Sequence, residues 1–349
     1  MTFKKIALKN AMRILFTSVS LLTFSLSSCT KNSDAGIINT AADSSANASA
    51  AAIKTRINTA SAAAVYTTSG VISLSNVHDI TISGKSIAGG SAPCIYLNNC
   101  YNIIITGNKL YNSTDVGIHL LQCHNISITK NYITNVSTGV YADHCPGGII
   151  QVHHNQFLNM QGPMPRGQFV QFDNVGGRYN SIGGNVGENI MGQSQPIDAI
   201  SLYQSSGTAS SPITINNNQI LGGGPSSTGG GIMLGDGGGS YLSASGNTLV
   251  NPGQYGIAIA GGSNNSIINN TIYGKAQSFT NIGLYVDPIG AAISNATVSG
   301  NKVLFYNSSG VQNDAWLAPG VATPAGWSTN LFGAPLSASI LPANIITDN

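Results

Sequence analysis

Ionisable side chains are scarce in this sequence, and several of them recur at equivalent positions of a repeat. Only 7% of the 349 residues are charged, against about 25% in ordinary domains. Asp143 and Asp173 occupy the same place in successive repeats, so their carboxylates would approach to about the spacing of neighbouring strands, 4.8 Å. Two acids that close repel, and they either share a proton or hold a cation such as Ca²⁺. The alternative is that both are solvated residues on an exposed face.

Other polar side chains fall beside these two acids when the repeats are aligned. The alignment predicts one outward row made of Tyr96, His119, Tyr141, Gln171, Ser201, Met233, Ala258, Tyr285 and Gln312. It predicts a second row made of Asn98, Leu121, Asp143, Asp173, Tyr203, Gly235, Ala260, Asp287 and Asp314, flanked by His144, Asn174, Gln204 and Asp236. Acids, histidines and tyrosines would therefore meet on one surface.

The repeat is clearest between Ile95 and Val175. Residues 95–100 return as 118–123 and again as 140–145, in steps of 23 and 22 residues. Each copy alternates apolar and polar residues, as a half-buried strand does, and a second short strand follows it. A period in the twenties with short strands and no helical periodicity predicts an all-β fold. We expect a single right-handed parallel β-helix of nine to ten coils over about residues 70–315, with a cap at each end.

One asparagine marks each repeat. It is followed two residues later by a hydrophobe, and the series runs Asn108, Asn131, Asn155, Asn185, Asn218, Asn247, Asn270 and Asn301. Identical amides at the coil spacing can hydrogen-bond along the axis. We expect these residues to form one stacked line at a single turn of the solenoid.

Three segments carry a family resemblance. Residues 80–84, 103–108 and 126–131 read Ile-Thr-Ile-Ser-Gly, Ile-Ile-Ile-Thr-Gly-Asn and Ile-Ser-Ile-Thr-Lys-Asn. They resemble the parallel β-helix (PbH1) repeat of the pectate-lyase-like superfamily, most of whose enzymes cut or epimerise acidic glycans. The resemblance implies a polysaccharide lyase that acts by β-elimination on an extended, uronate-containing polysaccharide. That step removes the proton α to a uronate carboxylate, which needs a base and neutralisation of the carboxylate charge.

The resemblance also implies roles for individual residues. Asp143 and Asp173 would hold a calcium ion, or Arg166 would pair bidentately with the uronate. His144, Tyr203 or His119 would move the proton. Substrate-binding residues would be Tyr141, Gln171, Gln204, Glu188, Asp198 and Asp236. No Lys projects from the predicted face, whereas β-helix lyases usually use Lys or Arg as the base.

Long connections narrow the choice of coils. Extra residues fall at 156–169, 186–199 and 219–231, and Ser205 to Pro212 lengthens a turn on the other edge. A strand face with long loops on both sides is a groove, where binding and catalytic groups tend to lie. These loops would bring Arg166, Glu188, Asp198 and Asp236 to the groove.

Two other functions stay open. A glycoside hydrolase of the polygalacturonase type also uses Asp residues on a β-helix face and does not require a uronate. A non-catalytic, glycan-binding surface protein is the third reading. Ultraviolet-absorbing unsaturated products would separate a lyase from a hydrolase, and binding without product would favour the third reading.

The N-terminus has the pattern of an export signal. Lys4, Lys5, Lys9 and Arg13 precede an apolar run that ends in Leu26-Ser27-Ser28-Cys29, as in a secretory signal. These four residues resemble the bacterial lipobox, which implies a lipoprotein signal over 1–28 with acylation of Cys29. We expect an exported protein of the cell envelope, held to a membrane through its lipid anchor only.

The rest of the chain gives the domain plan. Residues 29–52 are rich in Ala, Ser, Asn and Thr and predict a flexible tether. Residues 53–349 form one domain, in which 53–66 predict an amphipathic cap and the proline-containing end beyond Trp316 a second cap. The mature chain carries ten basic residues against twelve acids, so no clustered basic surface points to nucleic acid. We expect a monomer.

Cysteines recur in one register. Cys100, Cys123 and Cys145 occupy equivalent positions where the neighbouring coils have Val77 and Val175, which indicates buried small side chains. Stacked coils are close enough for a disulfide, but side chains in register point the same way. Reduced, stacked thiols are favoured over a disulfide or a zinc site. The disulfide state of Cys94 and of these three stays open.

Overall fold

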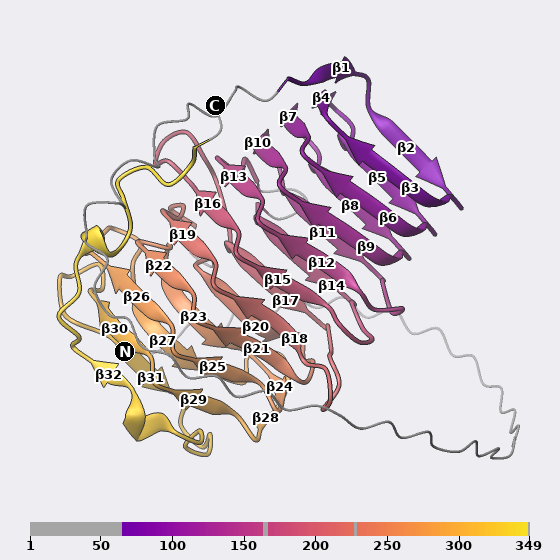
Figure 1. Cartoon of the computed structure of the whole chain (residues 1–349). Helices are drawn as coiled ribbons and strands as arrows, with labels where there is room; N and C mark the ends of the chain where they lie inside the picture. Colours follow the sequence, from indigo (N-terminus) through magenta and orange to yellow (C-terminus); the bar gives the residue numbers. More distant parts are fainter. Residues whose placement is uncertain (1–64, 163–166, 227–228, 348–349) are drawn as a thin grey trace, which may run out of the picture. The chain divides into compact units, whose positions relative to one another are not determined.

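The alternation of apolar and polar residues gives short strands that pair with the equivalent strand one coil away. We describe residues 65–162, 167–226 and 229–347 in a computed structural model of the chain (Figure 1). All pairings between the strands of the three large sheets are parallel, and the sheets run along the same solenoid. The predicted parallel β-helix is confirmed.

The first sheet has ten strands. In spatial order they are β2 (Ile72–Ser75), β5 (Ile95–Asn98), β8 (Ile118–Leu121), β11 (Val140–Asp143), β14 (Val170–Asp173), β17 (Ile200–Tyr203), β20 (Ile232–Asp236), β23 (Tyr255–Ile259), β27 (Ile282–Val286) and β31 (Ala315–Leu317).

The second sheet has nine strands. They are β3 (His78–Ser83), β6 (Tyr101–Thr106), β9 (His124–Thr129), β12 (Ile150–His153), β15 (Ser181–Gly183), β18 (Ile213–Asn216), β21 (Leu242–Ser245), β25 (Ser266–Ile268) and β29 (Thr297–Ser299).

The third sheet has eleven strands. They are β1 (Thr67–Ser69), β4 (Lys85–Gly90), β7 (Lys109–Ser113), β10 (Tyr132–Val136), β13 (Gln156–Leu158), β16 (Val186–Glu188), β19 (Gln219–Leu221), β22 (Thr248–Val250), β26 (Thr271–Gly274), β30 (Lys302–Phe305) and β32 (Leu331–Phe332). A small pair, β24 (Gly262–Ser263) and β28 (Ile293–Ser294), and two 3₁₀ turns, η1 (Trp327–Thr329) and η2 (Ala338–Ile340), complete the elements.

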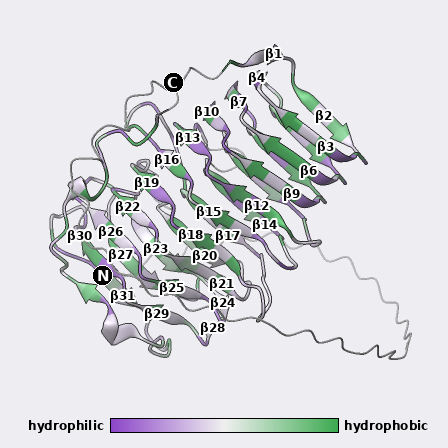
Figure 2. Cartoon of the chain, viewed as in Figure 1, coloured by the Kyte–Doolittle hydropathy of each residue, from purple (hydrophilic) through white to green (hydrophobic). Residues whose placement is uncertain are grey.

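The core is a stack of aliphatic side chains from all three sheets. Ile95, Ile118 and Val140 lie above one another on the first sheet and are fully buried. Figure 2 shows the result as hydrophobic and hydrophilic residues alternating along the strands. Each coil buries its inner residues against its neighbours, so the solenoid is stabilised by nearest-neighbour packing.

The predicted asparagine line is confirmed as a buried hydrogen-bonded ladder between the second and third sheets. Asn131 donates its side-chain amide to Asn155 Oδ1 over 3.0 Å, and Asn155 donates in turn to Asn185 Oδ1 over 3.1 Å. The backbone N–H of each residue donates to the same oxygen. The ladder continues to Asn330, one coil beyond the predicted series. Amides inside the solenoid are thereby satisfied without water.

The three cysteines form a shorter ladder between the first and second sheets. Cys100, Cys123 and Cys145 are free and fully buried, as is Cys94. The backbone N–H of Cys123 donates to Cys145 Sγ over 3.3 Å, and Ser205 Oγ accepts the equivalent bond from Val175 further along. Burial raises the pKa of Cys123 to about 11 and that of Cys145 to about 12. These thiols are structural and belong to no metal cluster among the described residues.

The last coil has a different register from the one predicted. Tyr285 pairs with Trp316, whereas the alignment had placed Gln312 there. Asp314 is correspondingly not on the outward row: it is buried and accepts backbone hydrogen bonds from Phe305 and Gly333. The connection between β30 and β31 contains a tight turn at Asn307–Gly310 that the repeat pattern does not show.

The end of the chain runs back along the third sheet. We call residues 335–347 the C-terminal strap. Leu341 and Ile345 of the strap pack on Val250. The backbone N–H of Thr347 donates to Gln156 Oε1 over 2.7 Å. The predicted C-terminal cap therefore covers a sheet face in addition to the last coil.

Several predictions lie outside the described residues. The chain divides into Met1–Ala60 and Ser61–Asn349. The signal, Cys29, the tether and all but the last two residues of the 53–66 cap precede the described part. Within that part, no helix is both long and apolar enough to cross a membrane.

Candidate functional site

The outer face of the first sheet gathers most of the predicted site residues. Tyr96, His119, Tyr141, Gln171 and Ser201 are successive partners across the strands, as predicted. The second row runs Asp143, Asp173, Tyr203 and then Asp236. Asp236 replaces the predicted Gly235 because a bulge shifts the register after Leu202. Gly235 itself adopts a φ of +70°, a conformation that suits glycine.

Asp173 is held from two sides. Tyr141, one coil earlier, donates its hydroxyl to Asp173 Oδ2 over 3.0 Å, and Asn174 donates its amide to Oδ1 over 2.8 Å. The Asp173 side chain is nearly buried, with 6% exposure. Its carboxylate therefore has a fixed orientation beside the Tyr141 phenol.

Asp143 lies among two histidines. His144 Nδ1 makes a short contact with Asp143 Oδ1, and His119 Nε2 lies 3.9 Å from Asp143 Oδ2. That second distance is longer than a hydrogen bond, and His119 Nε2 is buried with no hydrogen-bond partner. Burial lowers the pKa of His119 although Asp143 and Asp115 act in the opposite direction. His119 is therefore harder to protonate than an exposed histidine, although a carboxylate lies beside it.

An aromatic row accompanies these acids. The His119 ring lies 5.1 Å from the Tyr96 ring and 5.0 Å from the Tyr141 ring, measured between centroids. All three side chains are partly exposed. The Tyr96 and His119 rings meet edge to face at 64° and the His119 and Tyr141 rings are tilted by 33°, so the row is an aromatic cluster with partly exposed edges.

His144 and Gln204 lie in the turn that follows each strand of the first sheet. Both residues have positive φ, of 49° and 46°, at the position that Asn99 and Asn174 fill in other coils. The left-handed conformation favours asparagine and also tolerates histidine. Gln204 donates to the Tyr203 hydroxyl over 3.1 Å.

The side chains in the middle of the outward row are buried. Gln171 and Ala258 are fully buried, and Ser201 and Met233 nearly so. The Gln171 amide turns back to donate to the Phe172 carbonyl over 3.1 Å. The prediction that Gln171 binds substrate is wrong, because its side chain lies under its neighbours rather than on the surface.

A second polar cluster lies on the later coils. Tyr255 donates its hydroxyl to the buried Asp198 over 2.5 Å, and Gly230 N–H donates to the same oxygen. Burial raises the pKa of Tyr285, and Asp198, Asp287 and Asp236 add to the effect. Burial also raises the pKa of Asp287. Asp198 therefore links its loop to the first sheet. The sequence predicts that Asp198 faces the groove, whereas in the structure it is buried.

The sequence did not indicate Tyr255. It occupies an inward position by strand alternation, yet it packs outside with Met233 and Tyr285. The connection before β23, residues 251–254, is short and carries no signal for this outward packing.

One other predicted residue does not reach this face. Glu188 lies on β16 of the third sheet, where its carboxylate accepts the backbone N–H of Ile345 over 3.2 Å. Its assignment to the groove is wrong because strand β16 turns it toward the C-terminal strap. Arg166 lies outside the described residues.

The long connections are where the sequence placed them. They run between third-sheet and first-sheet strands at 159–169, 189–199 and 222–231. Met191, Pro196, Ile197 and Pro225 of the second and third connections line a hollow of about 690 Å³ together with polar residues. The connections before β17 and β20 thus line one edge of the first sheet.

The described residues do not form a preassembled calcium site. No group of three or more His, Cys, Asp or Glu suited to a metal occurs in the described ranges, while Ca²⁺ takes six to eight oxygens. Both carboxylates already have protein partners. Calcium binding between Asp143 and Asp173 stays a prediction.

Comparisons with known proteins agree on the fold. Residues 13–186, slightly under half of the chain, match a family model described as a right-handed β-helix region. No curated protein matches the sequence.

Two solved structures are similar in fold. PfbA, a surface adhesin of Streptococcus pneumoniae, is 12% identical with a TM-score of 0.51 over 71% of this chain and 62% of its own. The catalytic unit of a thermostable GH87 α-1,3-glucanase from Streptomyces thermodiastaticus strain HF3-3 is 13% identical over 77% and 52%, with a TM-score of 0.37. This chain thus spans less than two thirds of either structure. The first similarity supports the fold alone, and the second is too weak to argue from.

Proposed function

We propose that this protein cleaves glycosidic bonds of a polysaccharide bound along the outer face of the first sheet. The observation that carries the proposal is the set formed by Tyr141, Asp173 and Asp143 beside His119. It combines two carboxylates one coil apart with groups that hold and exchange protons. The aromatic row next to it suits an extended sugar chain.

The charge of the face favours hydrolysis over β-elimination. Asp143, Asp173, Asp198, Asp236 and Asp287 lie on or beside the first sheet. All six described Lys and Arg residues lie in or near strands of the other two sheets: Lys85, Lys109, Lys130, Arg178, Lys275 and Lys302. A uronate about 5 Å from one of these acids would be repelled by roughly 1–3 kcal/mol. Hydrolysis needs acids alone, so a neutral polysaccharide fits this face better than an acidic one.

Two carboxylates then divide the work. Asp143, which contacts His144 and lies 3.9 Å from His119 Nε2, donates a proton to the leaving oxygen. Asp173, oriented by Tyr141 and Asn174, attacks the anomeric carbon as the bond to the leaving oxygen breaks. A water that gives a proton back to Asp143 then cleaves the glycosyl–Asp173 ester and releases the sugar. The strands that carry Asp143 and Asp173 are about 4.8 Å apart. This spacing is close to the separation of about 5–5.5 Å between the two catalytic carboxyl groups of retaining enzymes. We expect retention of the anomeric configuration.

β-Elimination is the second candidate function. His119, whose pKa is lowered by burial, and Tyr141, whose ring lies 5.0 Å away between centroids, are two side chains that could move the proton in an elimination. Arg166 or a calcium ion would then have to neutralise the uronate. This is the polysaccharide-lyase activity that the pectate-lyase-like resemblance implies, with Tyr203 and His144 as further proton carriers.

A polysaccharide panel distinguishes these reactions. Neutral and uronate polymers are incubated with the protein, with and without a chelator, and reducing ends and unsaturated ends are measured separately. Hydrolysis gives reducing ends on neutral chains without ultraviolet absorbance. Chelator-sensitive unsaturated products from uronates would instead establish β-elimination.

Variants locate the chemistry. Asp173→Asn should lower turnover by about 10²–10⁴, whereas Asp79→Asn on the second sheet should leave it unchanged. Full activity in the Asp143→Asn, Asp173→Asn double variant would place the chemistry elsewhere. Binding without any product would support the glycan-binding reading.

For the location of the protein, we propose an exported lipoprotein acylated at Cys29. Several acyl chains hold a protein firmly where a single chain holds only marginally. Cys29→Ala should release the protein into the soluble fraction or block its processing, as measured by fractionation. Unchanged membrane association of that variant would contradict the lipid anchor.

A further inference from the structure

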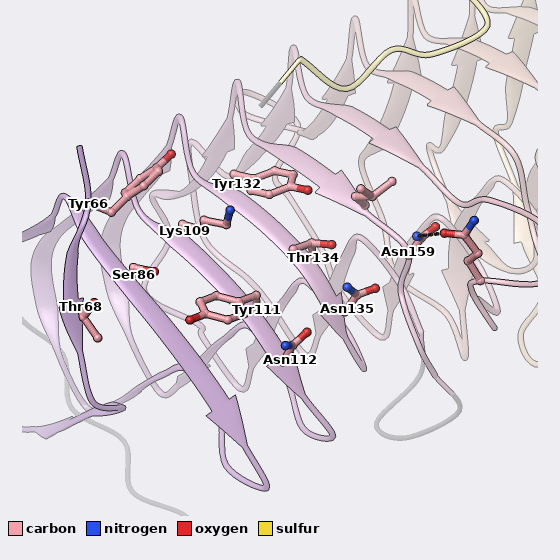
Figure 3. Close-up of a pocket in the computed structure, with 12 residues that line it drawn as sticks. Tyr66, Thr68, Ser86, Lys109, Tyr111, Asn112, Tyr132, Thr134, Asn135 and Asn159 are labelled. Atoms are coloured by element: carbon pink, nitrogen blue, oxygen red, sulfur yellow. Dashed lines mark hydrogen bonds between the residues drawn. The ribbon is translucent and has the colours of Figure 1, made fainter. Parts of the chain in front are cut away.

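The third sheet has a groove on its early coils that the first-sheet site does not explain. The groove has a volume of about 720 Å³ and runs across β1, β4, β7, β10 and β13. Five strands span about 19 Å. Tyr66, Tyr111 and Tyr132 line it together with Lys109 and the amides of Asn112, Asn135 and Asn159 (Figure 3).

The floor and the edges of the groove differ in exposure. Tyr132 and Thr134 form a nearly buried floor, and the Lys109 amino group lies 5.5 Å from the centroid of the Tyr132 ring. Tyr66 and Tyr111 are half-buried. Figure 3 shows Tyr111 and Tyr132 projecting from neighbouring strands onto the same face. At the far end, Asn159 donates to Gln193 Oε1 over 3.3 Å.

The same sheet face changes character along the solenoid. On the later coils its outward residues include Val186, Leu221 and Val250, which the C-terminal strap covers with Leu341 and Ile345. The strap meets Gln156 through Thr347, at the border of the groove. On the early coils the outward residues are Ser86, Lys109, Tyr111, Tyr132 and Thr134. The strap covers the apolar part, whereas the part lined by Tyr66, Lys109, Tyr111 and Tyr132 is polar and aromatic and is covered by none of the described residues.

The charge of the groove is opposite to that of the first sheet. Its only charged lining residue is Lys109, and the five strands contain Lys85 and Lys109 but no acid. Lys130 lies two residues before β10. The outward row of this face thus carries one positive charge, Lys109, and no acid among the described residues.

We propose that this groove binds an acidic polysaccharide of the polyuronate type, separately from the chain that the first sheet cleaves. Tyrosine rings stack on the sugar rings, amides of Asn112 and Asn135 hydrogen-bond the hydroxyls, and Lys109 attracts the carboxylates. The site does not depend on the proposed hydrolysis, because no residue is shared.

Binding of polygalacturonate and of its methyl-esterified form tests the inference. The two polymers have the same backbone and differ in charge. The full chain should bind polygalacturonate more tightly, and added salt should weaken that binding. Equal affinity for both forms, or no binding of polygalacturonate, overturns the proposal.

Matched variants locate the site. Tyr111→Ala should weaken binding about tenfold, the size of one well-placed aromatic contact. Lys109→Gln should weaken it about two- to fivefold and only for the acidic form. Tyr179→Ala, an exposed tyrosine beside the second sheet, should have no effect. A loss on Asp173→Asn instead, with Tyr111→Ala unchanged, places the polyuronate on the first sheet and overturns the groove.

Discussion

Replacement of Asn155 by alanine tests the ladder that holds the coils in register. Asn155 Oδ1 accepts two hydrogen bonds from Asn131, from its backbone N–H and from its side-chain amide, both over 3.0 Å. Its own amide donates to the Ile128 carbonyl over 2.9 Å. All of these bonds are buried, so the variant leaves polar groups without partners and without access to water.

The cost follows from the number of groups left without a partner. The Asn131 backbone N–H has no alternative acceptor in the ladder, and Ile128 loses a donor. Each such buried group costs about 1–3 kcal/mol, so Asn155→Ala should lower the free energy of unfolding by about 2–6 kcal/mol. Asn330→Ala is the matched control, because Asn330 accepts the same two bonds from Asn301 in a half-buried place at the end of the ladder.

Equilibrium unfolding in urea, followed by far-ultraviolet circular dichroism, measures both variants. Asn330→Ala should cost about 1 kcal/mol or less, because water reaches the groups it exposes. The slope with denaturant should stay the same, so that the midpoints can be compared. A loss below 1 kcal/mol at Asn155, or equal losses at the two positions, would refute the ladder as a source of stability.

Two further predictions concern the first sheet and the strap. The pKa of His119 is lowered by burial, so the stability it contributes is present above the ordinary histidine pKa of about 6.5 and is lost as the pH falls through the lowered value. An NMR titration should give a His119 midpoint below that of an exposed histidine, and a midpoint at or above it would contradict the burial. Leu341→Asp should detach the C-terminal strap and make residues 335–347 sensitive to protease, while Ser339→Asp, at an exposed position, should not; equal resistance would mean that the apolar contact with Val250 does not hold the strap.

Residues that repeat in every coil could be placed from the sequence. Strand alternation set the outward position of Tyr141 and Asp173, and the asparagine series fixed their register. Both features depend on nearest-neighbour stacking, which a periodic pattern records directly.

Residues whose position depends on an irregularity could not be placed. The bulge that moves Asp236 beside Tyr203, the outward turn of Tyr255 and the burial of Gln171 each result from contacts between coils of unequal length. The path of residues 335–347 also has no periodic signal, so Glu188 was assigned to the wrong face. The local sequence pattern determines where the strands of a coil lie. The contacts of loops and termini determine which of its side chains can meet a ligand.

The C-terminal strap changes how such a solenoid unfolds. Its hydrogen bonds join residues 157 and 191 positions apart, at Ile345 with Glu188 and Thr347 with Gln156. A stack with only neighbour contacts can fray from either end, one coil at a time. Here the coils from β13 to β26 lie under a segment that follows all of them in the chain. The final coils therefore cannot unfold before the strap is released. We expect the coils under the strap to unfold as one cooperative unit. We also expect the strap to close late in folding, because its contacts are distant in sequence.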